Sequence, residues 1–182
     1  MNIKSIIILI VFVSFVLGLR AQERYQVSQG VISFYSSAPL EDIYAVNNKV
    51  RSLIDLSTLE FAFVVPIPGF EFRKALMKTH FNERYLESDK YPNATFTGKL
   101  IGESVTEKSG MKKIVAEGEI KIHGVAKMMA IPATIIFEDD KLIVESEFIL
   151  KPKDFKIKIP RILIKNIAEE VLVKVNLVYE LE

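Results

Sequence analysis

The chain has 182 residues, with 24 Lys and Arg against 23 Asp and Glu, two His, no Cys and no Trp. This near-neutral balance lacks the basic excess that marks nucleic-acid-binding proteins, so no nucleic-acid partner is expected. The absence of cysteine excludes disulfides, and two histidines are too few for the common zinc or non-haem iron sites, so we expect no metal.

Residues 1–21 have the three-part layout of a secretory signal peptide. Lys4 gives a positive start, residues 6–17 are apolar except for Ser14, and Ala21 is a small residue before the expected cleavage site. The apolar stretch is short for a membrane span, and an uncleaved N-terminal anchor is the alternative. The prediction is therefore export, to the periplasm or out of the cell, of a single mature domain over residues 22–182 with no membrane-spanning segment.

From Tyr25 onward the apolar residues alternate with polar ones, which is the pattern of half-buried β-strands. Strands are expected over residues 31–36, 40–46, 50–56, 59–67, 94–101, 114–122, 126–137, 142–150 and 171–181. Residues 155–159 also alternate and predict a short strand, and residues 160–168 predict an irregular or helical crossover. His123-Gly124 and Asp139-Asp140 are the expected turns that end two of the longest strands.

Many antiparallel strands joined by short turns are typical of a sandwich or a closed barrel. The apolar faces mix small residues such as Ala116, Gly118 and Ser146 with phenylalanines, which favours a hollow barrel. Periodicity alone leaves both architectures open.

Residues 70–96 form the one long segment after the N-terminus that does not read as strand. Residues 73–79 can form one or two helical turns, and six aromatic residues fall within these 27 positions. These rings could plug one end of a barrel as ordinary core, the expectation for Phe72 and Phe96, or line an elongated apolar cavity.

Catalytic signatures are absent from the sequence. No Gly-x-Ser-x-Gly elbow and no glycine-rich phosphate loop occurs, and the acidic pairs have no apolar neighbours that would tune them for glycoside chemistry. His80 and His123 are expected to make local hydrogen bonds in turns. We therefore expect no enzyme; catalysis through either histidine is the alternative.

Two segments resemble the YceI-like family of exported, lipocalin-like proteins. Residues 70–98 follow the pattern of the family's insert and middle strand, and residues 118–125, Gly-Glu-Ile-Lys-Ile-His-Gly-Val, are similar to its Gly-x-Leu-Thr-Ile-His-Gly-Val segment. The resemblance extends over residues 25–182. It implies an all-β fold, a lipocalin-like antiparallel β-barrel of about eight strands with a short helical insert.

The resemblance also implies a function, the binding of an isoprenoid tail such as that of a quinone or a polyprenyl phosphate, with no other cofactor required. Where many members of the family carry Arg-Asp, this chain has Met77-Lys78, so a polar pair that could hold a head group is missing. The residues expected to line or rim an apolar cavity are Phe63, Phe70, Phe72, Leu76, His80, Phe81, Tyr85, Phe96 and Phe148.

One alternative function comes from another class. A small barrel with a filled interior could serve as an interaction module whose partner meets the outer surface. Neither a monomer nor a homodimer is excluded by the sequence.

Overall fold

The computed structural model describes residues 23–37, 42–102, 105, 107–158 and 169–182. The predicted signal peptide and the expected crossover at 160–168 therefore lie outside the described residues. The strands are β1 (Arg24–Ser36), β2 (Ile43–Asn47), β3 (Arg51–Asp55), β4 (Glu60–Pro66), β5 (Glu71–Phe72), β6 (Asn93–Ile101), β7 (Gly110–Ile122), β8 (Val125–Glu138), β9 (Lys141–Leu150) and β10 (Val171–Leu181).

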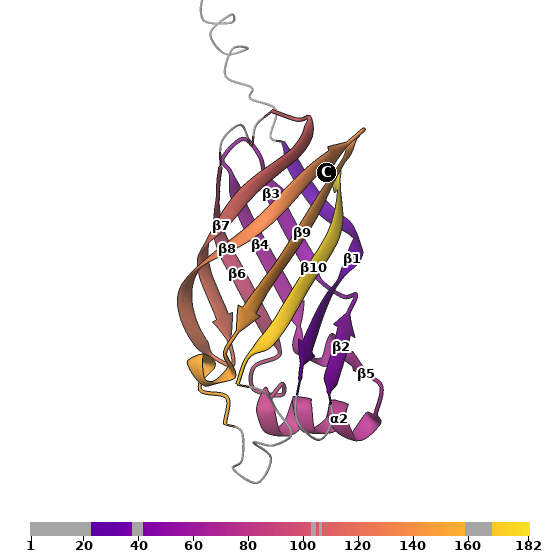
Figure 1. The fold of residues 1–182 in the computed structure, drawn as a ribbon, viewed down its shortest axis with the longest axis vertical. Coiled ribbons are helices and arrows are strands. Elements are labelled where there is room, and N and C mark those ends of the chain that lie inside the picture. Colours follow the sequence, from indigo (N-terminus) through magenta and orange to yellow (C-terminus); the bar gives the residue numbers. More distant parts are fainter. Residues whose placement is uncertain (1–22, 38–41, 103–104, 106, 159–168) are drawn as a thin grey trace, which may run out of the picture.

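Eight antiparallel strands close into a barrel (Figure 1). The order around the wall is β1-β3-β4-β6-β7-β8-β9-β10, and β10 pairs back onto β1 from Tyr25↔Leu181 to Tyr35↔Leu172. Closure pairs the backbone groups that an open sheet would leave at its edges. The predicted all-β barrel of about eight strands is confirmed, and the sandwich alternative is wrong.

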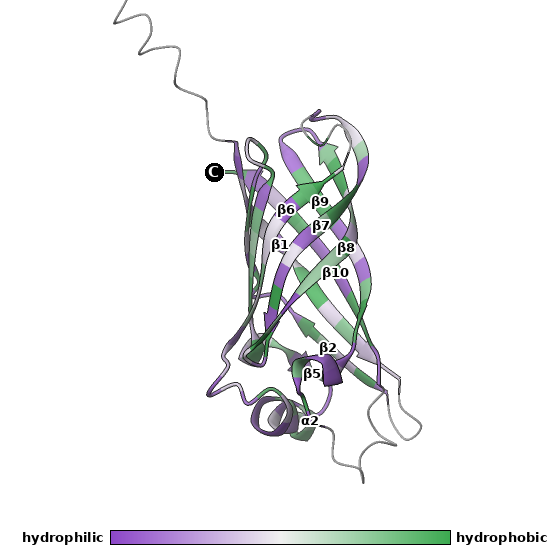
Figure 2. Cartoon of the chain, turned by 90° about the vertical axis from the view of Figure 1, so that its left-hand side faces the viewer, coloured by the Kyte–Doolittle hydropathy of each residue, from purple (hydrophilic) through white to green (hydrophobic). Residues whose placement is uncertain are grey.

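Alternation along the strands places apolar side chains inside the wall and polar ones outside. Figure 2 shows hydrophobic and hydrophilic residues interspersed along the ribbons of the wall. On β7, for example, Ile114, Ala116 and Ile120 are buried while Glu117 and Glu119 are exposed. A one-residue shift in register would reverse both faces, so burial of one face fixes the pairing.

Strands β2 and β3 run along the same side of β1 and are separated by a short break. Here Asn47 is fully buried, donates from its side-chain amide to the Pro66 carbonyl at 2.8 Å, and accepts from the Lys49 N–H at 2.8 Å. These two bonds hold the break in β2–β3 against the end of β4. The pairing partner changes at this break, since β3 pairs with β4 whereas β2 pairs with β5.

One end of the barrel is filled by packed side chains. Tyr25, Leu56, Val105 and Leu142 are buried there, and the Tyr179 hydroxyl donates to Ser52 Oγ at 2.8 Å. This is the end where the chain finishes, drawn at the top of Figure 1. The barrel interior is closed on that side.

The insert lies across the opposite end (Figure 1). It contains the 3₁₀ turn η1 (Ile67–Gly69), the strand β5, the helix α2 (Ala75–His80) and the π-helical segment η2 (Phe81–Tyr85). The predicted short helical insert at the rim of a barrel is confirmed. Among the described residues, no helix is both long and apolar enough to cross a membrane.

The strand expected over residues 155–159 is wrong. Pro152–Phe155 forms the 3₁₀ helix η3, and Lys156 follows it in the left-handed region with a φ of 56°. Pro152 favours the first turn of a helix, and burial of Phe155 against the barrel end fixes the turn. The alternation of Phe155, Lys156 and Ile157 arises from one buried ring within a tight turn.

Candidate functional site: an apolar cavity at the insert end of the barrel

A cavity of about 620 Å³ extends from the insert end into the barrel, as far as Ile54, Leu100 and Ile114. Its wall along β7 runs from Ile114 to Ile122, about 27 Å of extended strand, or about 20 Å along the axis of a barrel with ordinary strand tilt. The volume lies within the range of pockets that hold small organic ligands. The interior is therefore hollow, and the filled barrel of the alternative function is wrong.

The nine residues expected from sequence all lie on the wall or rim of this cavity. Their part in binding a ligand stays a prediction. Phe63 and Phe96 pair across β4 and β6, and Phe148 is on β9. The insert contributes the remaining six, which are Phe70, Phe72, Leu76, His80, Phe81 and Tyr85.

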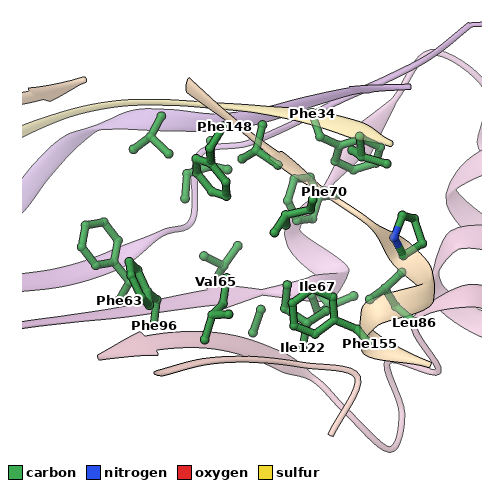
Figure 3. A pocket seen from close by; sticks show the side chains of 18 of the residues that line it. Phe34, Phe63, Val65, Ile67, Phe70, Leu86, Phe96, Ile122, Phe148 and Phe155 are labelled. Atoms are coloured by element: carbon green, nitrogen blue, oxygen red, sulfur yellow. The ribbon is translucent and has the colours of Figure 1, made fainter. Parts of the chain in front are cut away.

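Four phenylalanines form a cluster between the insert and β1 (Figure 3 shows Phe34 and Phe70). Phe34 stacks on Phe81 with ring centroids 5.5 Å apart, and Phe72 lies 5.0 Å from Phe81. Phe70 contacts both Phe34 and Phe81 edge to face. Since three of these rings come from the insert, the cluster attaches the insert to the barrel while facing the cavity.

A second aromatic group lies deeper, on the wall formed by β4 and β6. The rings of Phe61 and Phe96 are 4.7 Å apart, and Phe61 contacts Phe63 at 5.7 Å. Phe72 and Phe96, for which a core role was also open, are partly buried and face the cavity as well. These two rings therefore belong both to the hydrophobic core and to the cavity wall, because the core and the wall share the same side chains.

Sequence reasoning missed several wall residues. Phe34 was on an alternating strand, but nothing in the pattern said which face is internal. Phe155 was placed in a strand that does not exist, whereas it is buried and closes one side of the mouth (Figure 3). Leu86 directly follows η2, where period-two reasoning does not apply, whereas Ile67, expected as the last residue of a strand, begins the 3₁₀ turn η1.

The face of the insert that lines the cavity repeats every four residues. Met77, Phe81 and Tyr85 form one row, and Leu76, His80 and Arg84 form a second row beside it. Residues four apart are neighbours on one face of a helix, so each row forms a continuous strip. All three members of the first row are partly buried, whereas Leu76 and Arg84 are exposed. The first row therefore faces the interior and the second forms its rim.

The position of Lys78 settles one expectation from sequence. Its ammonium group binds Glu71 Oε1 on β5 at 2.7 Å, and the residue does not line the cavity. This contact holds the pKa of Glu71 below its usual range, first through the hydrogen bond from Lys78. Lys78 therefore joins α2 to β5 and does not line the mouth, which agrees with the expectation that positions 77 and 78 hold no polar pair for a head group.

His123 connects three segments at the barrel end. Its Nε2 lies 2.6 Å from Glu87 Oε2 of the insert, and its Nδ1 lies 3.2 Å from the Phe155 carbonyl oxygen of η3. The Tyr91 ring packs edge to face on the imidazole at 4.8 Å. His123 was expected in a turn, which is confirmed, but its hydrogen bonds reach distant segments rather than local ones.

The cavity is almost entirely apolar, and its ionisable groups lie on the insert. Among the described lining residues these groups are Lys74, His80, Arg84 and Tyr85, and none is acidic. Burial raises the pKa of the Tyr85 hydroxyl, and the nearby Arg84 cation offsets part of that rise. Tyr85 is therefore a neutral hydrogen-bond donor at physiological pH. No group of three metal-ligating side chains occurs in the described part of the chain.

Solved structures with the same architecture come from several bacteria. A polyisoprenoid-binding domain from Saccharophagus degradans matches with a TM-score of 0.74 and 15% identity, covering 87% of this chain and 98% of that one. BcnA from Burkholderia cenocepacia matches with a TM-score of 0.70 and 16% identity, covering 82% and 95%. A YCEI protein from Campylobacter jejuni matches with a TM-score of 0.56 and 19% identity, covering 71% and 78%.

At these identities the structural matches establish the fold alone. A search of curated protein sequences finds no match to the chain. The model of the YceI-like domain, however, matches residues 26–179, which include all of the barrel but the first two residues of β1 and the last two of β10, together with the insert and the cavity described above. The chain therefore belongs to the YceI-like family.

Proposed function

We propose that this protein is an exported carrier that holds the apolar tail of an isoprenoid lipid, such as a polyprenyl chain or an isoprenoid quinone, inside the barrel. The observation that carries the proposal is the cavity of about 620 Å³, closed at one end and walled by aliphatic and aromatic side chains. Each buried methylene of a tail contributes about 0.8 kcal/mol, so a long tail binds tightly without directional contacts. Such a site suits storage or transport rather than catalysis.

Two further findings support the proposal. The Saccharophagus degradans domain, which shares the fold, is described as polyisoprenoid-binding. The signal-peptide pattern of residues 1–21 agrees with export, where a carrier would move a water-insoluble lipid between membranes or hold it away from water.

Native mass spectrometry of the protein purified from its own host tests the proposal. We expect an adduct whose mass, after extraction into organic solvent, corresponds to a long apolar molecule with an isoprenoid repeat. A clean apo mass, together with no binding of an added isoprenoid quinone, would disprove carrier function.

A pair of substitutions locates the site. Phe81→Asp puts a charge at the centre of the insert's inner row and should reduce quinone binding at least tenfold, since a buried unpaired charge is costly. Tyr44→Asp makes the same change at an outward position that is 45% exposed and does not line the cavity, so binding should be unchanged. Equal losses in both variants would place the ligand elsewhere.

A further inference from the structure

The rim of the cavity carries positive charge and no negative charge. The cations of Lys74 and Arg84 and the imidazole of His80 line the mouth, and no Asp or Glu occurs among the described lining residues. The rest of the polar lining is limited to the uncharged hydroxyl groups of Ser36, Tyr85, Thr95 and Ser146, and Ser146 already donates to the Pro132 carbonyl at 2.7 Å. The charged lining residues are therefore confined to the mouth, and none of them is negatively charged.

The nearby carboxylates of the insert are directed to other partners. Glu71 is bonded to Lys78, and Glu87 is bonded to His123. Glu83 is exposed and does not line the cavity. In the part of the chain that the structure describes, no ion pair joins Arg84 to a carboxylate. The Arg84 charge at the mouth is thus not neutralised by the protein's own acids.

Geometry places two of these groups side by side. His80 and Arg84 occupy successive positions of the rim row, four residues apart on the same helical face. Arg84 offers a planar fork of donors suited to the two oxygens of a carboxylate or phosphate. The Tyr85 hydroxyl, kept neutral by burial, lies in the neighbouring row as a further donor. A site that binds an anionic group needs hydrogen-bond donors and no nearby carboxylate that competes for them.

From this arrangement we infer that the ligand is an amphiphile with an anionic head group, a carboxylate or a phosphate, bound at the mouth by Arg84 and His80 with its tail inside the barrel. The inference rests on the proposed function, since it concerns the head group of the lipid held in the same cavity. Neutral lipids such as quinones would bind through the tail alone.

Matched ligand pairs separate the head group from the tail. Binding of farnesyl phosphate is compared with that of farnesol, and binding of palmitate with that of hexadecanol, by calorimetry below the concentrations at which these lipids aggregate. We expect the anionic member to bind about tenfold tighter in at least one pair, and the preference to shrink as salt is raised. A preference in only one pair identifies the head group as phosphate or carboxylate.

Charge-removing variants test the residues. Arg84→Gln, alone and combined with His80→Gln, should abolish the preference for the anion while leaving alcohol binding within about twofold. Arg73→Gln is the matched control, because Arg73 is exposed on the same insert and does not line the cavity. An equal effect of Arg73→Gln would mean general attraction to a basic surface, and would overturn the inference.

Failure of the inference differs from failure of the proposed function. Equal affinity for phosphate and alcohol, or for acid and alcohol, in both pairs would overturn the anionic head group while leaving tail binding intact. No binding of any of the four lipids would overturn both. A loss of alcohol binding in Arg84→Gln as large as the loss of anion binding would assign Arg84 an apolar packing role and also contradict the inference.

Discussion

Single side chains set the closed end of the barrel. The Tyr179 ring is fully buried and its hydroxyl donates to Ser52 Oγ, which is also buried. Burial raises the pKa of Tyr179 far above its usual range, so the hydroxyl keeps its proton and the bond persists at any pH at which the protein is handled. The cavity has a floor because this end is packed and its polar groups are paired.

Removing this hydroxyl tests that account. Tyr179→Phe leaves the ring but takes the partner from a buried Ser52, and should lower the free energy of unfolding by about 1–2 kcal/mol. Urea denaturation followed by circular dichroism measures the change. Tyr44→Phe, on an exposed ring, should stay within about 0.5 kcal/mol of the wild type. A loss of similar size in both variants would rule out a special role for the buried bond.

Two strands of the barrel approach each other more closely than side chains allow. Gly98 on β6 and Gly118 on β7 are directly opposite, and a Cβ added at Gly118 would lie 2.1 Å from the Thr97 carbonyl oxygen. Because the obstacle is backbone, no rotamer change can relieve it. The close contact therefore requires glycine at both positions.

Two glycine substitutions distinguish a steric clash with a neighbouring strand from the backbone strain of a positive φ. Gly118→Ala should lower the free energy of unfolding by roughly 3 kcal/mol or prevent folding. Gly110→Ala, where φ is 66° and no atom lies within 4 Å of the added Cβ, should cost only about 1–2 kcal/mol of backbone strain. Thermal and urea denaturation rank the two variants. A larger loss for Gly110→Ala would contradict the crowding at the β6–β7 contact.

The insert is attached to the barrel at both ends. The phenylalanine cluster joins it to β1, and the Glu87–His123 bond joins its far end to the β7–β8 turn. His123 and Glu87 have φ values of 51° and 44°, and Gly124 has a φ of 73° with Tyr91 packed against its missing side chain. These left-handed residues bring the two segments into contact.

Losing the second attachment should loosen the insert without unfolding the barrel. Glu87→Ala removes the partner of His123 and should speed amide exchange over residues 81–91 roughly threefold to tenfold, with barrel strands unaffected. Glu83→Ala is the matched control, an exposed glutamate on the same segment. Hydrogen exchange with mass spectrometry compares them. Identical exchange in the two variants would show that the bond does not hold the insert.

At the scale of the whole molecule, the cavity has space for a ligand because small residues line part of its wall. Ala133 on β8 faces the interior, whereas Ala130 on the same strand is exposed on the outer face. The empty space lowers the packing density at the centre of the barrel, since larger inward side chains would fill it. Ligand binding and core stability are therefore in opposition at these positions.

Filling the space tests whether the cavity volume limits binding. Ala133→Phe should fit without unfolding the barrel and weaken binding of an apolar fluorescent probe about tenfold, because a displaced ligand segment of two methylenes forfeits about 1.6 kcal/mol. Ala130→Phe should leave binding unchanged. Fluorescence titration gives the affinities and thermal melting verifies folding. Unchanged binding in Ala133→Phe would show that the ligand does not reach this depth.

Much of the site was predictable because it follows from local patterns. The alternation of β7 places Ile114, Ala116 and Ile120 on one face wherever the strand lies, and the aromatic density of residues 70–96 marks the rim. Phe155 was not predictable, since two alternating residues look the same in a strand and in a 3₁₀ turn. The partners of Lys78 and His123 were also out of reach, because they lie on segments brought near only by the fold.

By itself the sequence determined most of the strands, many of their apolar faces, the helical insert and most of the aromatic residues of the site, because these depend on period-two alternation and on breaks in it. The tertiary structure decided the rest: that the sheet closes, that one end is filled and the other hollow, and that the basic rim row faces the opening. Closure depends on pairing β1 with β10, nearly the full length of the chain apart. Whether the interior is hollow depends on which inward side chains of different strands lie at the same height in the barrel, and no local sequence pattern encodes that.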